Sequence, residues 1–127
     1  MHKHFLLFVF LFCVVLSGCG DGTVKSSGTV KFSSGEPVPY GTVFFETPQF
    51  SYTGKIQNGT YQIEGVQSGS GLPPGKYNVY VVGTDPVTEL SLFDEKFTNP
   101  ATSGLSFEVK GGQKNIFDFT VAPVTSK

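Results

Sequence analysis

The chain has 127 residues, a formal net charge of −1 and a charged content of only 15%. It contains no arginine, and its nine lysines form no cluster. Nucleic acid and anionic surfaces both require concentrated positive charge, so nucleic acid is excluded as an expected partner. The length suits a single domain.

Residues 1–18 are expected to be a targeting segment rather than part of the fold. A polar and basic start with His2, Lys3 and His4 precedes an almost uninterrupted apolar run over residues 5–16. This run is shorter than the roughly 20 residues that a helix needs to cross a bilayer. The pattern therefore predicts a signal peptide that is cleaved from the mature protein.

The segment ends in Leu16, Ser17, Gly18 and Cys19, which resemble the lipobox of bacterial lipoproteins. The resemblance implies cleavage before Cys19 and acylation of its thiol. Acyl chains would then hold the protein to a membrane on the non-cytoplasmic side, in the cell envelope. Residues 19–27 are mostly small and polar, which predicts a flexible tether between lipid and fold.

The mature chain would have few groups suited to catalysis. Both histidines and Cys13 leave with the signal peptide, and the thiol of Cys19 would carry lipid. No disulfide could then form within the chain, and no histidine would remain to activate a serine. The sequence therefore predicts a protein that is not an enzyme, with no catalytic residue and no cofactor.

Carboxylates are the remaining candidates for chemistry. Asp94 and Glu95 form the only adjacent acidic pair, and such neighbours tend to point apart, so acid-base catalysis is not expected. Oxygen ligands from this pair and Asp85 would suit calcium, yet their spacing matches no calcium-binding loop. We therefore expect no metal site.

Alternating apolar and polar residues predict strands throughout the rest of the chain. Asn58 and Gly59 lie between two of them and favour a tight type I′ hairpin, which needs positive φ at both positions. Residues 28–122 are thus expected to form an all-β domain, a seven-stranded immunoglobulin-like or prealbumin-like β-sandwich, with a tail at 123–127. The strands are expected at residues 28–32, 42–46, 52–57, 60–64, 76–83, 105–110 and 116–121.

Residues 83–104 form a long connection in this prediction. They show no clear strand, and residues 88–96 lie between Pro86 and Pro100, which limits any helix there to one or two turns. Connections of this length are often functional or mobile, so a surface role is expected here.

Six segments of the chain look familiar when they are taken together, at residues 28–30, 35–43, 54–63, 72–79, 95–105 and 111–119. Within them, Gly59 and Gly75 suit tight turns, Pro73 and Pro74 stiffen the entry to a strand, and Tyr61 and Tyr77 are expected on core faces. The first four segments resemble the carboxypeptidase regulatory-like domain, a transthyretin-like β-sandwich, and the last two resemble the ending of small bacterial lipoproteins built on it. In that family the domain serves as a folding, spacing or binding module without catalytic residues. The resemblance implies a noncatalytic envelope lipoprotein with a structural or protein-binding role.

Aromatic side chains suggest a possible contact surface. Rings exposed at the end of a sandwich can stack on sugar or anchor a protein, so an envelope protein and a polysaccharide are both candidate partners. A cluster of exposed rings beside residues 83–104 would favour a carbohydrate-binding or substrate-capturing module, whereas rings that cover the core would not. The candidates, in loops or at outward positions, are Tyr40, Phe50, Tyr52, Phe93 and Phe97, together with Tyr80.

Overall fold

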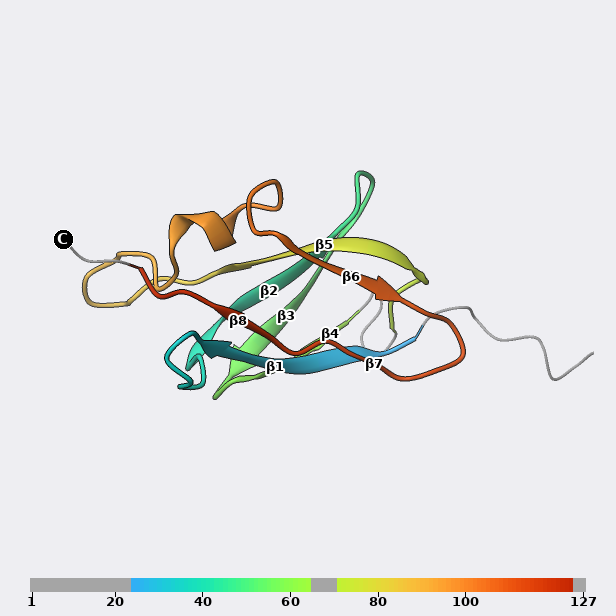
Figure 1. Ribbon diagram of the computed structural model, residues 1–127, viewed down its shortest axis with the longest axis horizontal. Coiled ribbons are helices and arrows are strands. Elements are labelled where there is room, and N and C mark those ends of the chain that lie inside the picture. The colour runs from blue at the N-terminus through green and yellow to red at the C-terminus, as the bar shows by residue number, and fades with distance from the viewer. Residues whose placement is uncertain (1–23, 65–70, 125–127) are drawn as a thin grey trace, which may run out of the picture.

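A computed structural model describes residues 24–64 and 71–124 of the protein (Figure 1). These residues form an all-β fold. The predicted signal peptide and Cys19 lie outside these ranges. The strands are β1 (Ser26–Phe32), β2 (Tyr40–Glu46), β3 (Ser51–Gln57), β4 (Thr60–Ile63), β5 (Gly75–Val82), β6 (Leu105–Val109), β7 (Asn115–Ile116) and β8 (Phe119–Val121), with one 3₁₀ turn, η1 (Glu95–Thr98).

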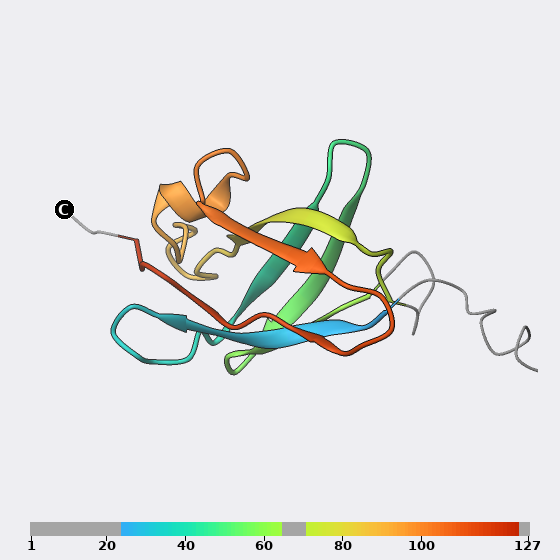
Figure 2. The same cartoon turned by 45° about the vertical axis from the view of Figure 1, so that its right-hand side comes forward.

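The strands form one curled, mixed sheet that encloses the core as a sandwich does. Their order is β6-β5-β2-β3-β4-β1-β7, and β8 also pairs with β1. Neighbours are antiparallel except β7 and β8, which run parallel to β1. The strands β6, β5, β2 and β3 form one side of the curl, and β1 with its partners forms the other (Figure 2). The predicted fold class is confirmed.

The hairpin between β3 and β4 has the predicted turn. Asn58 and Gly59 both have positive φ, at 50° and 84°, as a type I′ turn requires. The Gly59 amide also donates to the Val38 carbonyl at 2.7 Å, which ties the turn to the segment before β2. A side chain on Gly59 would meet the ring of Pro37, so glycine suits this position for two reasons.

The core is built from the inward positions of the strands. Phe45 is fully buried at its centre, with its ring 5.9 Å from that of Tyr77 and 6.0 Å from that of Phe107. The two ends of the strand order meet through side chains, because the Phe107 and Phe117 rings stack at 4.8 Å. The inward positions predicted for Tyr61, Tyr77 and their alternating neighbours are therefore confirmed.

The last predicted strand, residues 116–121, is divided into β7 and β8. The carboxylate of Asp118 accepts a hydrogen bond from the Thr29 amide at 2.9 Å, where a continuous ladder would place a backbone carbonyl. The amide of Phe117 still donates to Ser27 at 2.9 Å. A side chain thus interrupts the backbone ladder, and eight strands replace the seven expected.

The fold extends beyond both predicted boundaries of the domain. β1 begins at Ser26, inside the segment expected to be tether. The Val24 amide donates a hydrogen bond to the Leu72 carbonyl at 2.9 Å, and the Leu72 amide donates to the Val24 carbonyl at 2.7 Å. At the other end of the chain, the Val124 amide donates to the Leu92 carbonyl at 3.0 Å, inside the expected tail.

Residues 83–104 are incorporated into the fold rather than forming one open loop. Residues 84–91, which we call the end hairpin, fold back so that Thr84 bridges Ser91. The next residues pair with the C-terminal segment through a bridge between Phe93 and Pro123. A single turn, η1, follows, which agrees with the limit of one or two turns although it starts later than expected.

Candidate functional site

The five candidate aromatic residues do not form one surface. Tyr40 and Phe50 are 39% and 59% exposed, but Tyr52 is only 8% exposed and Phe93 is completely buried. Phe97 is half-buried and packs against the core. The prediction that these side chains face outward is therefore wrong for Tyr52 and Phe93.

Phe93 is buried because two distant segments enclose it. The backbone of Phe93 forms a β-bridge with Pro123, and the Phe93 ring lies 6.0 Å from that of Phe32. Glycines 41 and 83 leave room for the ring, since a Cβ on Gly83 would lie only 3.2 Å from it. The Phe93 ring is therefore part of the core at this end of the sandwich.

Tyr52 is buried because it takes an inward position in β3. Its ring lies edge-on to that of Tyr77, at 6.0 Å between centroids, and 6.2 Å from that of Phe50. The ring of Phe97 lies 5.4 Å from the Nζ atom of Lys96, a cation-π contact at the surface. Only Tyr40 and Phe50 thus remain as substantially exposed rings of the original five.

An aromatic pair that the sequence analysis did not combine lies on the outer face of the sheet. Phe44 in β2 stands opposite Tyr80 in β5, and their rings stack at 4.7 Å with 6° between their planes. The Tyr80 hydroxyl donates to Oε1 of Glu46 at 2.9 Å, and burial raises its pKa. The alternation of Phe44 with buried Val43 and Phe45 is the signal that could have located this pair.

Two open concavities lie beside the exposed surface of β3. One, of about 720 Å³, lies over β3 and β4 and has a polar lining that includes Lys55, Gln62 and Glu64. The other, of about 700 Å³, lies between the start of β2 and the end of β5, where Tyr40 and Val82 line it. Both are open to solvent, so neither isolates a reacting group from water.

Two of the carboxylates discussed as possible catalytic or calcium-binding groups, Asp94 and Asp85, serve as local caps. Asp94 accepts the Lys96 amide at 2.9 Å and begins η1. Asp85 accepts the amides of Thr88 and Val87, and these bonds hold the pKa of its carboxyl below the ordinary value. Within residues 24–64 and 71–124, no three His, Cys, Asp or Glu side chains gather as a metal site would require.

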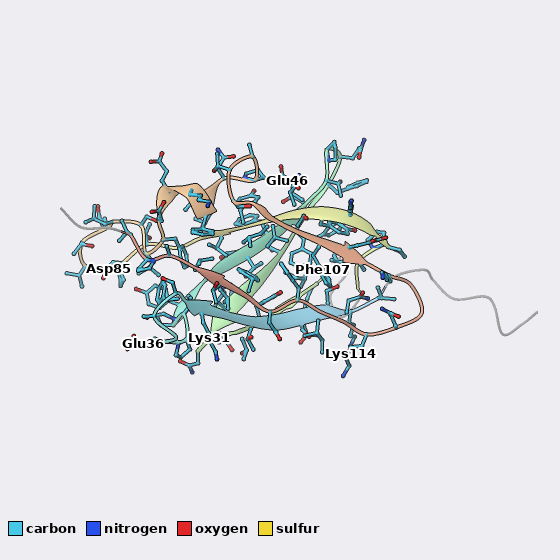
Figure 3. The ribbon with its side chains drawn as sticks, viewed as in Figure 1. Lys31, Glu36, Glu46, Asp85, Phe107 and Lys114 are labelled. Carbon is cyan, nitrogen blue, oxygen red and sulfur yellow. The ribbon has the colours of Figure 1, made fainter. Side chains whose placement is uncertain are left out.

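The end hairpin presents aliphatic side chains at the surface. Val87 is 87% exposed and Leu90 is 62% exposed. Asp85 lies at the left-hand end of the molecule, far from Lys114 near the other end (Figure 3). The described chain begins, in blue, close to that other end, and β1 runs from there towards the end hairpin (Figure 1).

The fold and these surfaces define a β-sandwich protein with two distinct ends. No helix in the described part of the chain is long and apolar enough to span a membrane. No protein-family model matches the chain, and no curated protein matches it well enough to indicate a relationship. The lipidation of Cys19 stays a prediction, since that residue lies outside the described ranges.

Proposed function

We propose that this chain is a noncatalytic, lipid-anchored lipoprotein of the cell envelope, whose β-sandwich acts as a structural or protein-binding module. The observation that carries the proposal is how soon the fold begins after Cys19. Val24 is already hydrogen-bonded to Leu72, and a fully extended chain covers at most about 18 Å over the five residue steps from Cys19 to Val24. A lipid on Cys19 would therefore hold this end of the sandwich near the membrane and direct the end hairpin away from it.

The surroundings of the polar side chains support a noncatalytic role. The Tyr77 hydroxyl donates to the Pro73 carbonyl at 2.6 Å, and the Tyr61 hydroxyl donates to the Phe117 carbonyl. Asp85 and Asp94 bind backbone amides beside them. Each of these two hydroxyls and two carboxylates makes a hydrogen bond to the backbone. None of the four faces a second reactive group in an enclosed cavity.

The lipid anchor is tested first by labelling with a palmitate analogue in a bacterial host that processes lipoproteins. The wild-type chain is expected to take up the label, to lose its signal peptide and to sediment with membranes. Cys19→Ala should abolish the label, whereas Cys13→Ala, inside the segment to be removed, should leave it unchanged. Equal labelling of wild type and Cys19→Ala would contradict the anchor.

The choice between structural and binding roles is tested by capture from envelope membranes. The lipidated chain and a soluble form that begins at Gly20 are immobilised in parallel, and a panel of polysaccharides is applied to both. Capture of a specific protein without retention of sugar supports the proposed role.

The alternative function is a carbohydrate-binding or substrate-capturing surface module. The observation that favours it is the exposed ring of Tyr40, which shares an open concavity with the polar side chains of Thr42, Lys55 and Gln57. Sugar binding uses such a combination of a ring and hydrogen-bonding groups. Retention of a polysaccharide that is lost in Tyr40→Ala and kept in Phe50→Ala would favour this alternative.

The resemblance to the carboxypeptidase regulatory-like domain belongs to the same proposal. A prealbumin-like domain is an all-β sandwich, and this chain has that fold class. The turn glycines Gly59 and Gly75, on which the resemblance partly rests, both have positive φ. Both features support the resemblance.

A further inference from the structure

Exposed apolar side chains gather at the end of the sandwich opposite to the start of the described chain. Of seven large apolar side chains that are exposed among the described residues, five lie at this end and only Phe50 and Ile116 lie elsewhere. We call these five the end surface, which consists of Tyr40, Val82, Val87, Leu90 and Val124.

Backbone contacts link the members of the end surface. Val124 donates to the Leu92 carbonyl at 3.0 Å, and Leu92 donates to the Gly83 carbonyl at 2.9 Å. Gly83 in turn lies against Gly41, which is the neighbour of Tyr40. The start of β2, the end of β5, the end hairpin and the C-terminal segment therefore form one continuous end of the molecule.

The tip of the end hairpin is held in one conformation by its own polar groups. The Asp85 carboxylate accepts the Val87 and Thr88 amides at 2.7 and 3.0 Å, and the Asp85 carbonyl accepts the Glu89 amide at 2.7 Å. The Leu90 amide donates to the Thr88 hydroxyl at 3.3 Å. Glu89 has φ of 65°, which is unfavourable for a residue other than glycine.

This arrangement fixes two aliphatic side chains in solvent without using them in the core. Val87 and Leu90 contribute nothing to the buried cluster of the sandwich. A loop that is ordered before it binds loses little conformational entropy on binding, and apolar groups at its tip gain by leaving water. The tip therefore suits insertion into an apolar recess on a partner.

The charges around the end surface distinguish between possible occupants. Asp85, Glu89, Asp94 and Glu95 lie in and just after the end hairpin along the chain, with Lys96 as the one lysine there. Lys55 lines the concavity that Tyr40 and Val82 share, so carboxylates still outnumber lysines at this end. A second copy of the chain, or an anionic lipid surface, would bring like charges together on contact. A protein surface with lysines or arginines around an apolar recess complements both features.

We propose that the end surface docks onto another protein of the cell envelope, with Val87 and Leu90 in an apolar recess and the carboxylates of Asp85 and Glu89 against a basic rim. This inference rests on the proposed protein-binding function and names the surface that performs it. The lipid at Cys19 would place this surface on the side of the domain that faces away from the membrane.

Site-specific crosslinking in living cells tests the proposal. A photoreactive phenylalanine analogue replaces Val87 or Leu90 in the full-length chain, and Ile116, which is 55% exposed near the other end, provides the matched control. One protein is expected to dominate the adducts at the first two positions and to be missing at the third. Adducts with a second copy of this chain, with lipid, or with the same proteins as at Ile116 would overturn the proposal.

Affinity measurements with the crosslinked protein then test the two features of the surface. The double variant Val87→Ser and Leu90→Ser should weaken binding by about tenfold or more, because a buried anchor is lost. Glu89→Lys should slow association and weaken its dependence on salt, and Ile116→Ser should change neither quantity. Unchanged affinity in the double variant would reject the end surface as the binding site.

The same experiment separates failure of this inference from failure of the proposed function. A dominant protein adduct at Ile116 alone would keep the protein-binding module and reject the end surface. Absence of protein adducts at Val87, Leu90, Ile116 and Phe50 would reject both.

Discussion

The aromatic core and the end hairpin place apolar side chains in opposite ways. In the core, Phe45 is fully buried, and the hydroxyls of Tyr61 and Tyr77 donate to backbone carbonyls. In the end hairpin, the Asp85 carboxylate binds the backbone while Val87 is 87% exposed. In both regions these polar side chains bind the backbone, but only the core uses apolar burial for stability. The exposed aliphatic side chains of the end hairpin are therefore available for another purpose.

The largest expected loss of stability is at Phe93, where the core meets the end hairpin. Phe93→Ala should lower the free energy of unfolding by about 3–5 kcal/mol, because it removes a fully buried ring two residues beyond the hairpin. Urea denaturation, monitored by circular dichroism, measures the change. Phe50→Ala, at an exposed ring, should change the free energy by less than about 0.5 kcal/mol. Equal effects of both substitutions would remove the distinction.

The next effect tests the hydroxyl groups of the core. Tyr61→Phe leaves the Phe117 carbonyl without its partner and should destabilise the fold by about 1–3 kcal/mol in the same denaturation experiment. Tyr40→Phe is the matched control, because that ring is 39% exposed and its hydroxyl can bind water. A neutral result for Tyr61→Phe would mean that the core does not depend on this bond.

Raising the pH into the alkaline range should destabilise the core before it affects the end hairpin. Burial raises the pKa of Tyr77 to about 12, and burial also raises that of Tyr61 above its ordinary range. Unfolded tyrosine ionises near pH 10, so the stability from these two groups is complete below about pH 10 and falls as pH rises towards about 12. Thermal unfolding across this range measures the loss. Tyr77→Phe should reduce the slope, and an unchanged slope would contradict the assignment.

Low pH should loosen the end hairpin, whereas high pH should weaken the core. Bonds from the Thr88 and Val87 amides hold the pKa of the Asp85 carboxyl below its ordinary value of 3.8. The order they provide is complete above that value and is lost as pH falls through the lowered pKa. Amide chemical shifts at Val87 and Thr88 should report this titration, and Asp85→Asn should remove it. A change that spreads to the core amides would contradict a local role.

The smallest expected effect is at the tip itself. Val87→Ser should change the free energy of unfolding by less than about 0.5 kcal/mol, because an exposed side chain loses no core contact. The comparison is with Val79→Ser, at a fully buried position of β5, which should destabilise by several times as much. A substantial loss in Val87→Ser would show that the tip contributes to folding.

The sequence predicted the strands well where burial follows a regular alternation. Tyr61 and Ile63 lie inward in β4 as expected, and the hairpin at Asn58 and Gly59 has the required positive φ. Both features depend on neighbouring residues alone, because side chains alternate along a strand and only some residues tolerate that turn. The interruption at Asp118 could not be predicted, since it depends on where Thr29 lies in space.

The candidate surface was harder to predict for the same reason. Phe93 and Val87 are both apolar residues in a segment without periodicity, yet one is fully buried and the other 87% exposed. The difference comes from the pairing of Phe93 with Pro123, which is 30 positions away along the chain. Aromatic character alone therefore identified Phe93 as a contact residue and overlooked Val87 and Leu90.

The sequence by itself determined the all-β fold class, the tight turns and the inward faces of the strands, because these depend on local patterns of polarity and backbone freedom. It also supplied the residues on which the proposed lipid anchor rests. Tertiary structure alone decided which residues of the long connection enter the core, since burial there depends on segments that meet only after folding. The exposed tip at Val87 and Leu90 is a result of that folding, because the C-terminal segment covers Phe93 and leaves the tip in solvent.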